Sequence, residues 1–201
     1  MRILLATRNA KKLVELQRIL DAAPNVAGVS IVGLSDVDAY REVPESGLTF
    51  AENALLKARE GVAHTGLPTV ADDSGLAVDV MCGMPGIFSA RWSGKHGDDD
   101  ANLDLLLTQL GDVPDDALTA QFVCAAALAL PDGRTFSVDG IMTGRLIRAR
   151  RGSGGFGYDP IFVADGHTRT NAELDPAEKD AISHRGKAFR GLSEIIAREL
   201  C

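Results

Sequence analysis

The segment "QFVCAAALALPDGRTFSVDGIMTGRLI", residues 121–147, decides the fold. It contains two β-like runs joined by Pro131, Asp132 and Gly133, a combination that is typical of a tight turn. Two strands joined by so short a turn run antiparallel, so the segment predicts a β-hairpin. The rest of the chain alternates strands with helices, and the sheet that holds all the strands is therefore predicted to be mixed.

Strand-like and helix-like segments lie on both sides of this hairpin. Residues 2–7 are β-like, and the predicted helix at 11–20 carries apolar residues at helical spacing. Further helices are predicted at 50–63, 98–110 and 183–200, with a strand at 68–71. The residues expected on the buried face of the first helix are Leu13, Leu16, Ile19 and Leu20. The pattern predicts an α/β fold over residues 1–201, with a mixed sheet flanked by helices, and the length suits one large domain or two closely packed lobes with no separable linker.

Composition narrows the class of partner. The chain has 201 residues and a formal net charge of -7, which argues against a nucleic-acid polymer as the main ligand. Its three cysteines are far apart and indicate neither a disulfide framework nor a zinc site. Signal-peptide and membrane-spanning patterns are both missing from the sequence. We therefore expect a cytoplasmic protein that can still bind a small anion at a local group of cations.

The turn "TRNAKK", residues 7–12, joins the first strand to the first helix. Backbone amides at a helix N-terminus, with Thr7, Asn9, Lys11 and Lys12 nearby, form a candidate phosphate site. The glycine spacing of a P-loop is missing. The alternative is that Asn9 simply caps the helix while the lysines are solvated.

The segment "TVADDSG", residues 69–75, places two adjacent carboxylates behind a short apolar run. Successive side chains on a strand point to opposite faces, so Asp72 and Asp73 are expected to face different ways. A carboxylate at a strand end can hold Mg²⁺ or take a proton from a water that attacks phosphorus. The alternative is an Asx-type turn, in which Asp73 and Ser74 bond nearby backbone amides ahead of Gly75.

The next candidate ligands lie upstream, in "EVPESGLTFAENALLKA", residues 42–58. Glu42 and Glu45 lie in a predicted loop, and either one can complete a metal site that Asp73 begins. Asn53 and Lys57 are four residues apart and share one helix face. A solvated acidic loop is the competing interpretation.

The glycine-rich segment "GSGGFGYDP", residues 152–160, carries two aromatic residues, Phe156 and Tyr158. Glycine lets a backbone approach a planar ligand closely, so a purine base stacked on either ring, with nearby amides at its edge, is one interpretation. The other is a tight turn with both rings in the core. The segment "EKDAISHRGKA", residues 178–188, gathers Lys179, His184, Arg185 and Lys187 near the start of the last helix. These donors suit an anion or a keto-bearing base, and a solvated helix start is the alternative.

Six blocks, taken in order, resemble the inosine/xanthosine triphosphate pyrophosphatase family over nearly the whole chain. The blocks are "LATRNAKKLVEL", "SGLTFAENALLKA", "ADDSGLAVDV", "GMPGIFSARWSG", "GGFGYDPIF" and "EKDAISHRGKA". The resemblance implies hydrolysis of ITP, dITP and XTP to the monophosphate and pyrophosphate. It also implies Mg²⁺ as cofactor, a cytoplasmic homodimer, and elongated subunits whose active-site cleft lies between two lobes.

Site residues follow from the same resemblance. Asp73 is implied as the proton acceptor and a magnesium ligand, and Glu45 is preferred to Glu42 as the second ligand. The residues implied to contact the substrate are Thr7, Arg8, Asn9, Ala10, Lys11, Lys12, Ser74, Phe156, Gly157, Tyr158, Asp159, Lys179, His184 and Arg185. Arg8 departs from the family pattern, which has a small residue at that position.

Two other functions stay open on sequence alone. One is a nucleotide-binding regulatory module without turnover, and the other is a pyrophosphatase for different modified nucleotides, such as the Maf-type proteins. The set formed by Asp73 and the loop glutamates favours an enzyme, because a protein that only binds its ligand does not require it.

Overall fold

The computed structural model describes residues 1–7, 9–22, 29–38, 40 and 43–200, and leaves out the side chains of residues 10, 11, 15, 16 and 20. Its strands are β1 (Arg2–Leu5), β2 (Ser30–Val32), β3 (Thr69–Val78), β4 (Thr119–Ala129), β5 (Thr135–Leu146) and β6 (Phe162–Ala164). Its α-helices are α1 (Ala10–Asp21), α2 (Phe50–Thr65), α3 (Asp99–Gln109), α4 (Pro176–Ile182) and α5 (His184–Leu200). Short 3-10 helices lie at Leu34–Asp36, Asp79–Met81, Gly86–Arg91, Asp115–Ala117, Asp159–Ile161 and Asn171–Glu173.

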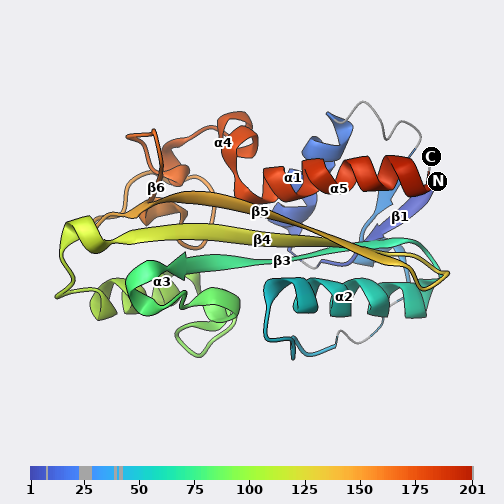
Figure 1. The fold of residues 1–201 in the computed structure, drawn as a ribbon, viewed down its shortest axis with the longest axis horizontal. Helices are drawn as coiled ribbons and strands as arrows, with labels where there is room; N and C mark the ends of the chain where they lie inside the picture. Colours follow the sequence, from blue (N-terminus) through green and yellow to red (C-terminus); the bar gives the residue numbers. More distant parts are fainter. Residues whose placement is uncertain (8, 23–28, 39, 41–42, 201) are drawn as a thin grey trace. The chain divides into compact units, whose positions relative to one another are not determined.

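The strands form one mixed sheet in the order β2-β1-β3-β4-β5-β6 (Figure 1). β1 pairs in parallel with β2 and β3, and β5 pairs antiparallel with β6. The predicted hairpin is confirmed: β4 and β5 are neighbours joined by a turn in which the Gly133 amide donates to the Leu130 carbonyl at 3.0 Å. The α/β class and the mixed sheet predicted from sequence are confirmed.

Two compact units divide the chain, and each is described by itself. Unit 1 comprises Met1–Asp73, Cys124–Gly140 and His184–Cys201, and unit 2 comprises Ser74–Val123 and Ile141–Ser183. Unit 1 therefore holds β1, β2, α1, α2 and α5, whereas unit 2 holds α3, α4 and β6. The three long strands, β3, β4 and β5, each contribute residues to both units.

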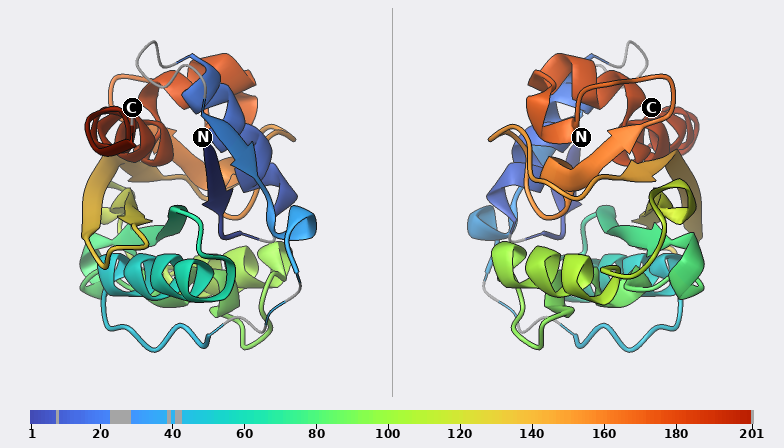
Figure 2. Two further views of the ribbon diagram at one scale, coloured as in Figure 1. Left: turned by 90° about the vertical axis from the view of Figure 1, so that its right-hand side faces the viewer. Right: turned by 90° about the vertical axis from the view of Figure 1, so that its left-hand side faces the viewer.

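In unit 1 the strands are covered by α1 and α5 on one face and by α2 on the other, which can be followed end-on in Figure 2. β4 shows the alternation directly. Cys124, Ala126 and Leu128 belong to a core with residues of α1 and α5, while the intervening alanines pack with Ala54 and Ala58 of α2. Small side chains on the α2 face let this helix lie close to the sheet.

Unit 2 has its own core. Leu103, Leu106 and Leu110, which come from α3 and the residue after it, pack with apolar residues of the strands and with Tyr158. α3 begins where the sequence indicates, because the Asp98 side chain caps it by accepting from the Ala101 amide at 3.3 Å. None of the helices in the described ranges has the length and apolar character needed to cross a membrane.

Two expectations about local structure are wrong. β3 does not end at the acidic pair but continues through Asp72, Asp73, Ser74 and Gly75 to Val78, so the Asx-turn alternative fails. The strand is buried along nearly its whole length, so its polar backbone groups need hydrogen-bond partners within the protein. Lys179 lies on the separate helix α4 and not at the start of the last helix, because Ser183 ends α4 in an extended conformation.

Candidate active site

Strand alternation separates the two adjacent aspartates of β3, as predicted. Val70 packs in the core that α1 and α5 cover, and Ala71 packs in the core that α2 covers. Asp72 and Asp73 continue the same alternation: Asp72 meets side chains of α1 and α5, and Asp73 meets side chains of α2. Both carboxylates are buried. The two adjacent aspartates therefore lie in different environments, Asp72 among side chains of α1 and α5 and Asp73 among side chains of α2.

Asp73 accepts hydrogen bonds from two residues of α2. The Asn53 Nδ2 atom lies 3.2 Å from Oδ2, and the Lys57 Nζ atom lies 3.1 Å from Oδ1. The two donors are four residues apart, so they share the helix face that looks onto β3. Thr49 fixes the start of this helix, since its side chain accepts from the Glu52 amide at 3.1 Å. The prediction that Asn53 and Lys57 share one helix face is confirmed, and the structure adds that this face contacts Asp73.

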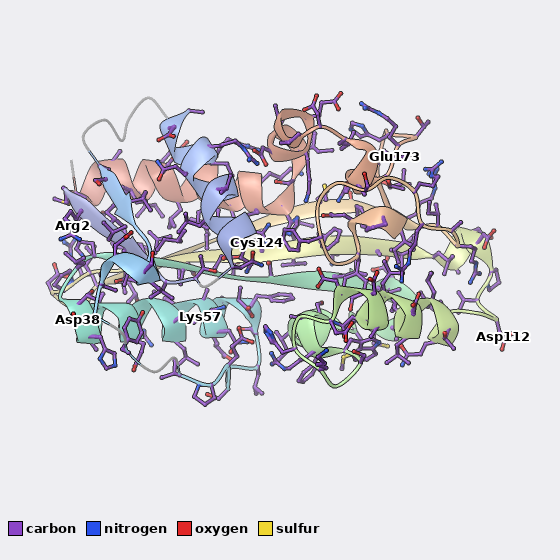
Figure 3. The ribbon with its side chains drawn as sticks, turned by 180° about the vertical axis from the view of Figure 1, so that it is seen from behind. Arg2, Asp38, Lys57, Asp112, Cys124 and Glu173 are labelled. Carbon is purple, nitrogen blue, oxygen red and sulfur yellow. The ribbon has the colours of Figure 1, made fainter. Side chains whose placement is uncertain are left out.

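Glu45 contacts the same lysine as Asp73 does. Its Oε1 atom lies 3.2 Å from Lys57 Nζ, so one ammonium bridges the carboxylates of Glu45 and Asp73. The loop that carries Glu45 is tied to α2 because the Gly47 amide donates to Asn53 Oδ1 at 2.8 Å. Figure 3 labels Lys57 on α2 and Cys124 on β4. Glu42, the other candidate ligand, lies outside the described residues.

The Glu45 and Asp73 carboxylates fit a hard divalent cation. Their oxygens already converge on a positive charge, and Mg²⁺ typically binds through one or two carboxylates while keeping waters and phosphate oxygens. Within the described ranges, no group of three or more His, Cys, Asp or Glu residues is placed to hold a metal. A magnesium ion at Glu45 and Asp73 would therefore need waters and phosphate oxygens to complete its shell.

Burial and charge move the pKa values of this group. Burial raises the pKa of the Asp73 carboxyl, and Glu45 raises it further, against the opposing effect of Lys57. Burial by itself would lower the pKa of Lys57, but Asp73, Asp72 and Glu45 outweigh it and the pKa is raised. The aspartate is thus shifted in the direction that suits a proton acceptor, while the lysine stays charged.

On the opposite face, Asp72 is the acceptor for two cations. Its Oδ2 atom lies 2.8 Å from Lys12 Nζ on α1 and 3.4 Å from Arg185 Nε on α5. Burial by itself would raise the pKa of Asp72, but Lys12, Arg185 and Lys57 outweigh this effect and lower the pKa well below its usual range. Asp72 is therefore a permanently charged support that holds two cationic side chains.

The turn before α1 has the local geometry of a capped helix. The Asn9 side chain accepts from the Lys12 amide at 3.3 Å, and the Asn9 amide donates to Thr7 Oγ1 at 3.2 Å. The capping alternative is thus correct for Asn9. It does not exclude anion binding, since an N-terminal turn keeps other amides for a ligand. Arg8 and the side chains of Ala10 and Lys11 lie outside the described residues.

His184 and Arg185 begin α5, and both are buried. Gly140 of β5 lets this helix start come close, because a Cβ there would meet the His184 carbonyl oxygen at 2.0 Å. Arg185 contacts Asp72, so the structure joins it to Lys12 across three separate segments of the chain. The solvated-helix-start alternative is wrong for these two residues.

In unit 2, Asp159 holds the residues predicted to bind a base. Its Oδ2 atom accepts from Lys179 Nζ at 2.7 Å and from the Phe156 amide at 2.8 Å. Its Oδ1 atom accepts from Asn171 Nδ2 at 3.2 Å. The Lys179 ammonium also lies 5.2 Å from the centre of the Phe156 ring. These contacts join Phe156, Asp159 and Lys179, three of the residues that the family resemblance implies for the substrate site.

The two aromatic residues of the glycine-rich loop differ. Tyr158 is buried in the core of unit 2, and its hydroxyl donates to the Ser89 carbonyl at 2.9 Å. The core interpretation is therefore correct for Tyr158, which offers no ring face to a ligand. Phe156 is only partly buried and is the ring that remains for stacking. The Gly157 amide, one of those expected at a base edge, donates to Asp99 at 3.0 Å.

Sequence reasoning missed Asp99 and Asn171. The acids near residue 98 indicated a favourable helix start, and nothing in their spacing indicates a contact with Gly157, 58 residues further along. Ser74 follows Asp73 in β3 and is partly buried, on the face that Asp72 shares by alternation.

The chain is similar to known proteins over nearly its whole length. The model of the Ham1 family matches residues 3–195. A dITP/XTP pyrophosphatase of Nocardia farcinica is 62% identical over 196 residues, which cover 98% of this chain and 95% of the relative. The crystal structure of a nucleoside-triphosphatase, or dITP/XTP pyrophosphatase, from Mycobacterium abscessus aligns with a TM-score of 0.79 and 58% identity, over 96% of this chain and 98% of that one.

A more distant solved structure also aligns with this chain over nearly its whole length. The HAM1 protein of Coxiella burnetii aligns with a TM-score of 0.88 at 38% identity, over 98% of this chain and 99% of its own. The match extends over both units, and the family resemblance drawn from the six sequence blocks is confirmed. The chain belongs to the Ham1 family.

Proposed function

We propose that this chain hydrolyses the non-standard purine nucleoside triphosphates ITP, dITP and XTP to the nucleoside monophosphate and pyrophosphate. The observation that carries the proposal is the set of Asp73, Glu45 and Lys57, in which one ammonium lies 3.1 and 3.2 Å from two carboxylates. A module that only binds a nucleotide has no need of a buried carboxylate with a raised pKa. Relatives of 62% and 58% identity that are named dITP/XTP pyrophosphatase support the same activity.

We further propose that the reaction depends on Mg²⁺ held by Asp73 and Glu45. The chemistry that Mg²⁺ supplies is neutralisation of triphosphate charge and orientation of the leaving group. The protein's own contribution is to aim both carboxylates at one point, which α2 does through Asn53 and Lys57.

Asp73 is proposed as the general base. Its carboxylate takes a proton from a water, the water oxygen forms a bond to the α-phosphorus, and the bond from that phosphorus to the bridging oxygen breaks. The electron pair leaves with pyrophosphate. Burial raises the pKa of Asp73 toward neutral pH, which makes the carboxylate a better proton acceptor than an exposed aspartate.

Cationic and amide groups are proposed to bind the triphosphate. The turn from Thr7 to Lys12 supplies helix N-terminal amides and Lys12, and Lys57 offsets further negative charge. Lys12 is held by Asp72 at 2.8 Å, so its ammonium is oriented before a ligand arrives. Such preorganisation lowers the ordering cost of binding.

Selectivity is proposed to rest on the 6-keto oxygen, which inosine and xanthosine carry where adenine has an amine. The family resemblance implies Lys179, His184 and Arg185 as donors for that oxygen, and Phe156 as a ring on which the base can stack. An amine at this position would face these groups donor against donor. Sites that hydrogen-bond a polar group of the substrate can favour it over an analogue that lacks this group by up to about 10⁴–10⁵ in kcat/KM.

The experiment that tests the function is a product assay over a panel of nucleotides. Purified protein is incubated with Mg²⁺ and ITP, dITP, XTP, ATP, GTP or dTTP, and pyrophosphate is separated from orthophosphate. We expect pyrophosphate as the primary product and much faster turnover of ITP, dITP and XTP. Orthophosphate as the primary product, or equal rates for ATP and ITP, would contradict the proposal. Fast turnover of dTTP instead would favour a Maf-type activity.

The family resemblance also leads us to propose a homodimer. Light scattering coupled to size-exclusion chromatography gives the mass directly, and a mass close to that of one 201-residue chain would refute this part of the proposal.

A further inference from the structure

The loop that carries Phe156 is fixed by carboxylates at two consecutive amides. The Phe156 amide donates to Asp159 Oδ2 at 2.8 Å, and the Gly157 amide donates to Asp99 Oδ2 at 3.0 Å. Charge-assisted hydrogen bonds of this kind are roughly twice as strong as neutral ones. Both amides are therefore engaged by the protein, and neither is available to read the edge of a base.

Asp159 is the local anchor. It lies three residues from Phe156 and also accepts from Lys179 at 2.7 Å and from Asn171 at 3.2 Å. Gly155 has a φ of +71°, and a Cβ there would lie 2.2 Å from Asp159 Oδ2, so only glycine allows the loop to wrap this carboxylate. The far end of the loop is held by Tyr158, whose hydroxyl donates to the Ser89 carbonyl.

Asp99 is the distant anchor, on the first turn of α3. Asp98 already caps this helix, so the Asp99 side chain is not needed as the cap and points to Gly157 instead. The contact joins a helix of the unit 2 core to the tip of the loop, next to the ring of Phe156. The Lys179 ammonium lies 5.2 Å from the centre of that ring, on the same carboxylate as the Phe156 amide.

We propose that Asp99 is a positioning residue for base recognition, which acts by holding the Gly157 amide and so fixing the ring of Phe156. This inference rests on the function proposed above and extends it to a residue outside the six sequence blocks. It also assigns the reading of the base edge to side-chain donors, because the amides of residues 156 and 157 are engaged.

The test compares Asp99→Ala with Asp99→Asn, which keeps an acceptor oxygen on the same stem. Loss of part of a stacking contact worth ~1–3 kcal/mol predicts a KM for ITP that rises about tenfold in Asp99→Ala, with kcat within about twofold. Asp99→Asn is expected to stay within about threefold of the wild type in KM, because a neutral acceptor still holds the Gly157 amide. The inhibition constant of inorganic tripolyphosphate, which has no base, is expected to stay unchanged in both variants.

Asp100→Ala is the matched control. Asp100 lies on the same turn of α3, carries the same charge, and pairs with Arg150 rather than with the loop. Its KM for ITP is expected to equal that of the wild type. An unchanged KM in Asp99→Ala, an equal rise in Asp100→Ala, or a weaker tripolyphosphate inhibition in Asp99→Ala would each overturn the proposal.

Hydrogen exchange separates failure of this proposal from failure of the function. If Asp99 holds the loop, exchange of the Gly157 amide becomes faster in Asp99→Ala and stays slow in Asp99→Asn, whatever the substrate is. If ITP is not hydrolysed but this exchange pattern is found, the proposed function is refuted, while the role of Asp99 in holding the Gly157 amide is supported. Equal exchange in all three proteins overturns the positioning role of Asp99.

Discussion

The Lys57 ammonium lies 3.1 Å from the Asp73 carboxylate, and the same ammonium lies 3.2 Å from Glu45. A positive charge of the protein therefore lies between the two carboxylates that are proposed to hold Mg²⁺. Lys57 keeps two buried or half-buried carboxylates close together that would otherwise repel each other. If Mg²⁺ binds there as proposed, Lys57 also competes with it for both carboxylates.

This competition predicts that Lys57→Met binds Mg²⁺ more tightly in the absence of nucleotide. Removing the ammonium leaves the negative charges of Asp73 and Glu45 uncompensated. The attraction between an ammonium and a carboxylate at this distance near a protein surface is worth a few kcal/mol at most. We therefore expect the affinity for Mg²⁺ to rise about tenfold. Turnover of ITP should fall in the same variant because the triphosphate loses a counter-charge. Calorimetric titration with MgCl₂ measures the first effect.

Lys12→Met is the control for that titration. Lys12 contacts Asp72 on the opposite face of β3 and acts on Asp73 only through its charge, so its removal should change Mg²⁺ affinity less than removal of Lys57 does. If both variants change Mg²⁺ affinity equally, or if Lys57→Met weakens it, the ammonium of Lys57 does not compete for the metal site.

Asp73→Asn removes the proposed general base and keeps the shape of the side chain. We expect kcat to fall by roughly 10²–10⁴ or more, since a general base typically contributes that much and a metal ligand is lost with it. The circular dichroism spectrum should stay that of the wild type. Wild-type turnover in this variant would refute the assignment of Asp73.

Asp72→Asn is expected to destabilise the protein, because Lys12 and the deeply buried Arg185 lose their anion. Breaking a buried pair typically costs about 3–5 kcal/mol in the free energy of unfolding. The folded-state pKa of Asp72 is lowered, so the stabilisation is present above the unfolded-state value of about 4 and is lost as pH falls through the folded-state pKa.

The difference in free energy of unfolding between wild type and Asp72→Asn should therefore be largest near neutral pH and shrink below about pH 4. Urea denaturation with a chelator present, at several pH values, measures it. A difference that stays constant over the acidic range would show that the Asp72 charge does not stabilise the fold.

Cys82→Gly should stabilise the protein. Cys82 has φ 52° and ψ 38°, the left-handed conformation that is strained for a residue with a Cβ, and its side chain is exposed. Relief of this strain, less the added entropy of the unfolded chain, predicts a gain of about 0.5–1 kcal/mol in the free energy of unfolding. Cys82→Ala keeps the Cβ and should be neutral. A gain in Cys82→Ala equal to that in Cys82→Gly would instead implicate the thiol.

Local patterns in the sequence were sufficient for most of the fold. The turn at Pro131-Asp132-Gly133 predicts the hairpin, and the apolar spacing of residues 50–63 predicts α2 with its buried alanines. The same reasoning placed the end of β3 too early. Two adjacent acids look like the end of a buried strand, and only the cations that reach them from α1, α2 and α5 let the strand continue through them.

The candidate site was predictable where its contacts are local and unpredictable where they are distant. Asn53 and Lys57 share a helix face by their spacing, and alternation sends Asp72 and Asp73 to different faces. The contact between Asp72 and Arg185 spans 113 positions, and the contact between Asp99 and Gly157 spans 58. Such pairs depend on how helices pack on the sheet, which no local pattern records.

Hydrolysis of ITP in oxygen-18 water tests the central claim most directly. If water activated by Asp73 attacks the α-phosphorus, mass spectrometry will find the label in inosine monophosphate and none in pyrophosphate. Label in pyrophosphate, or release of labelled orthophosphate as the first product, would contradict the account.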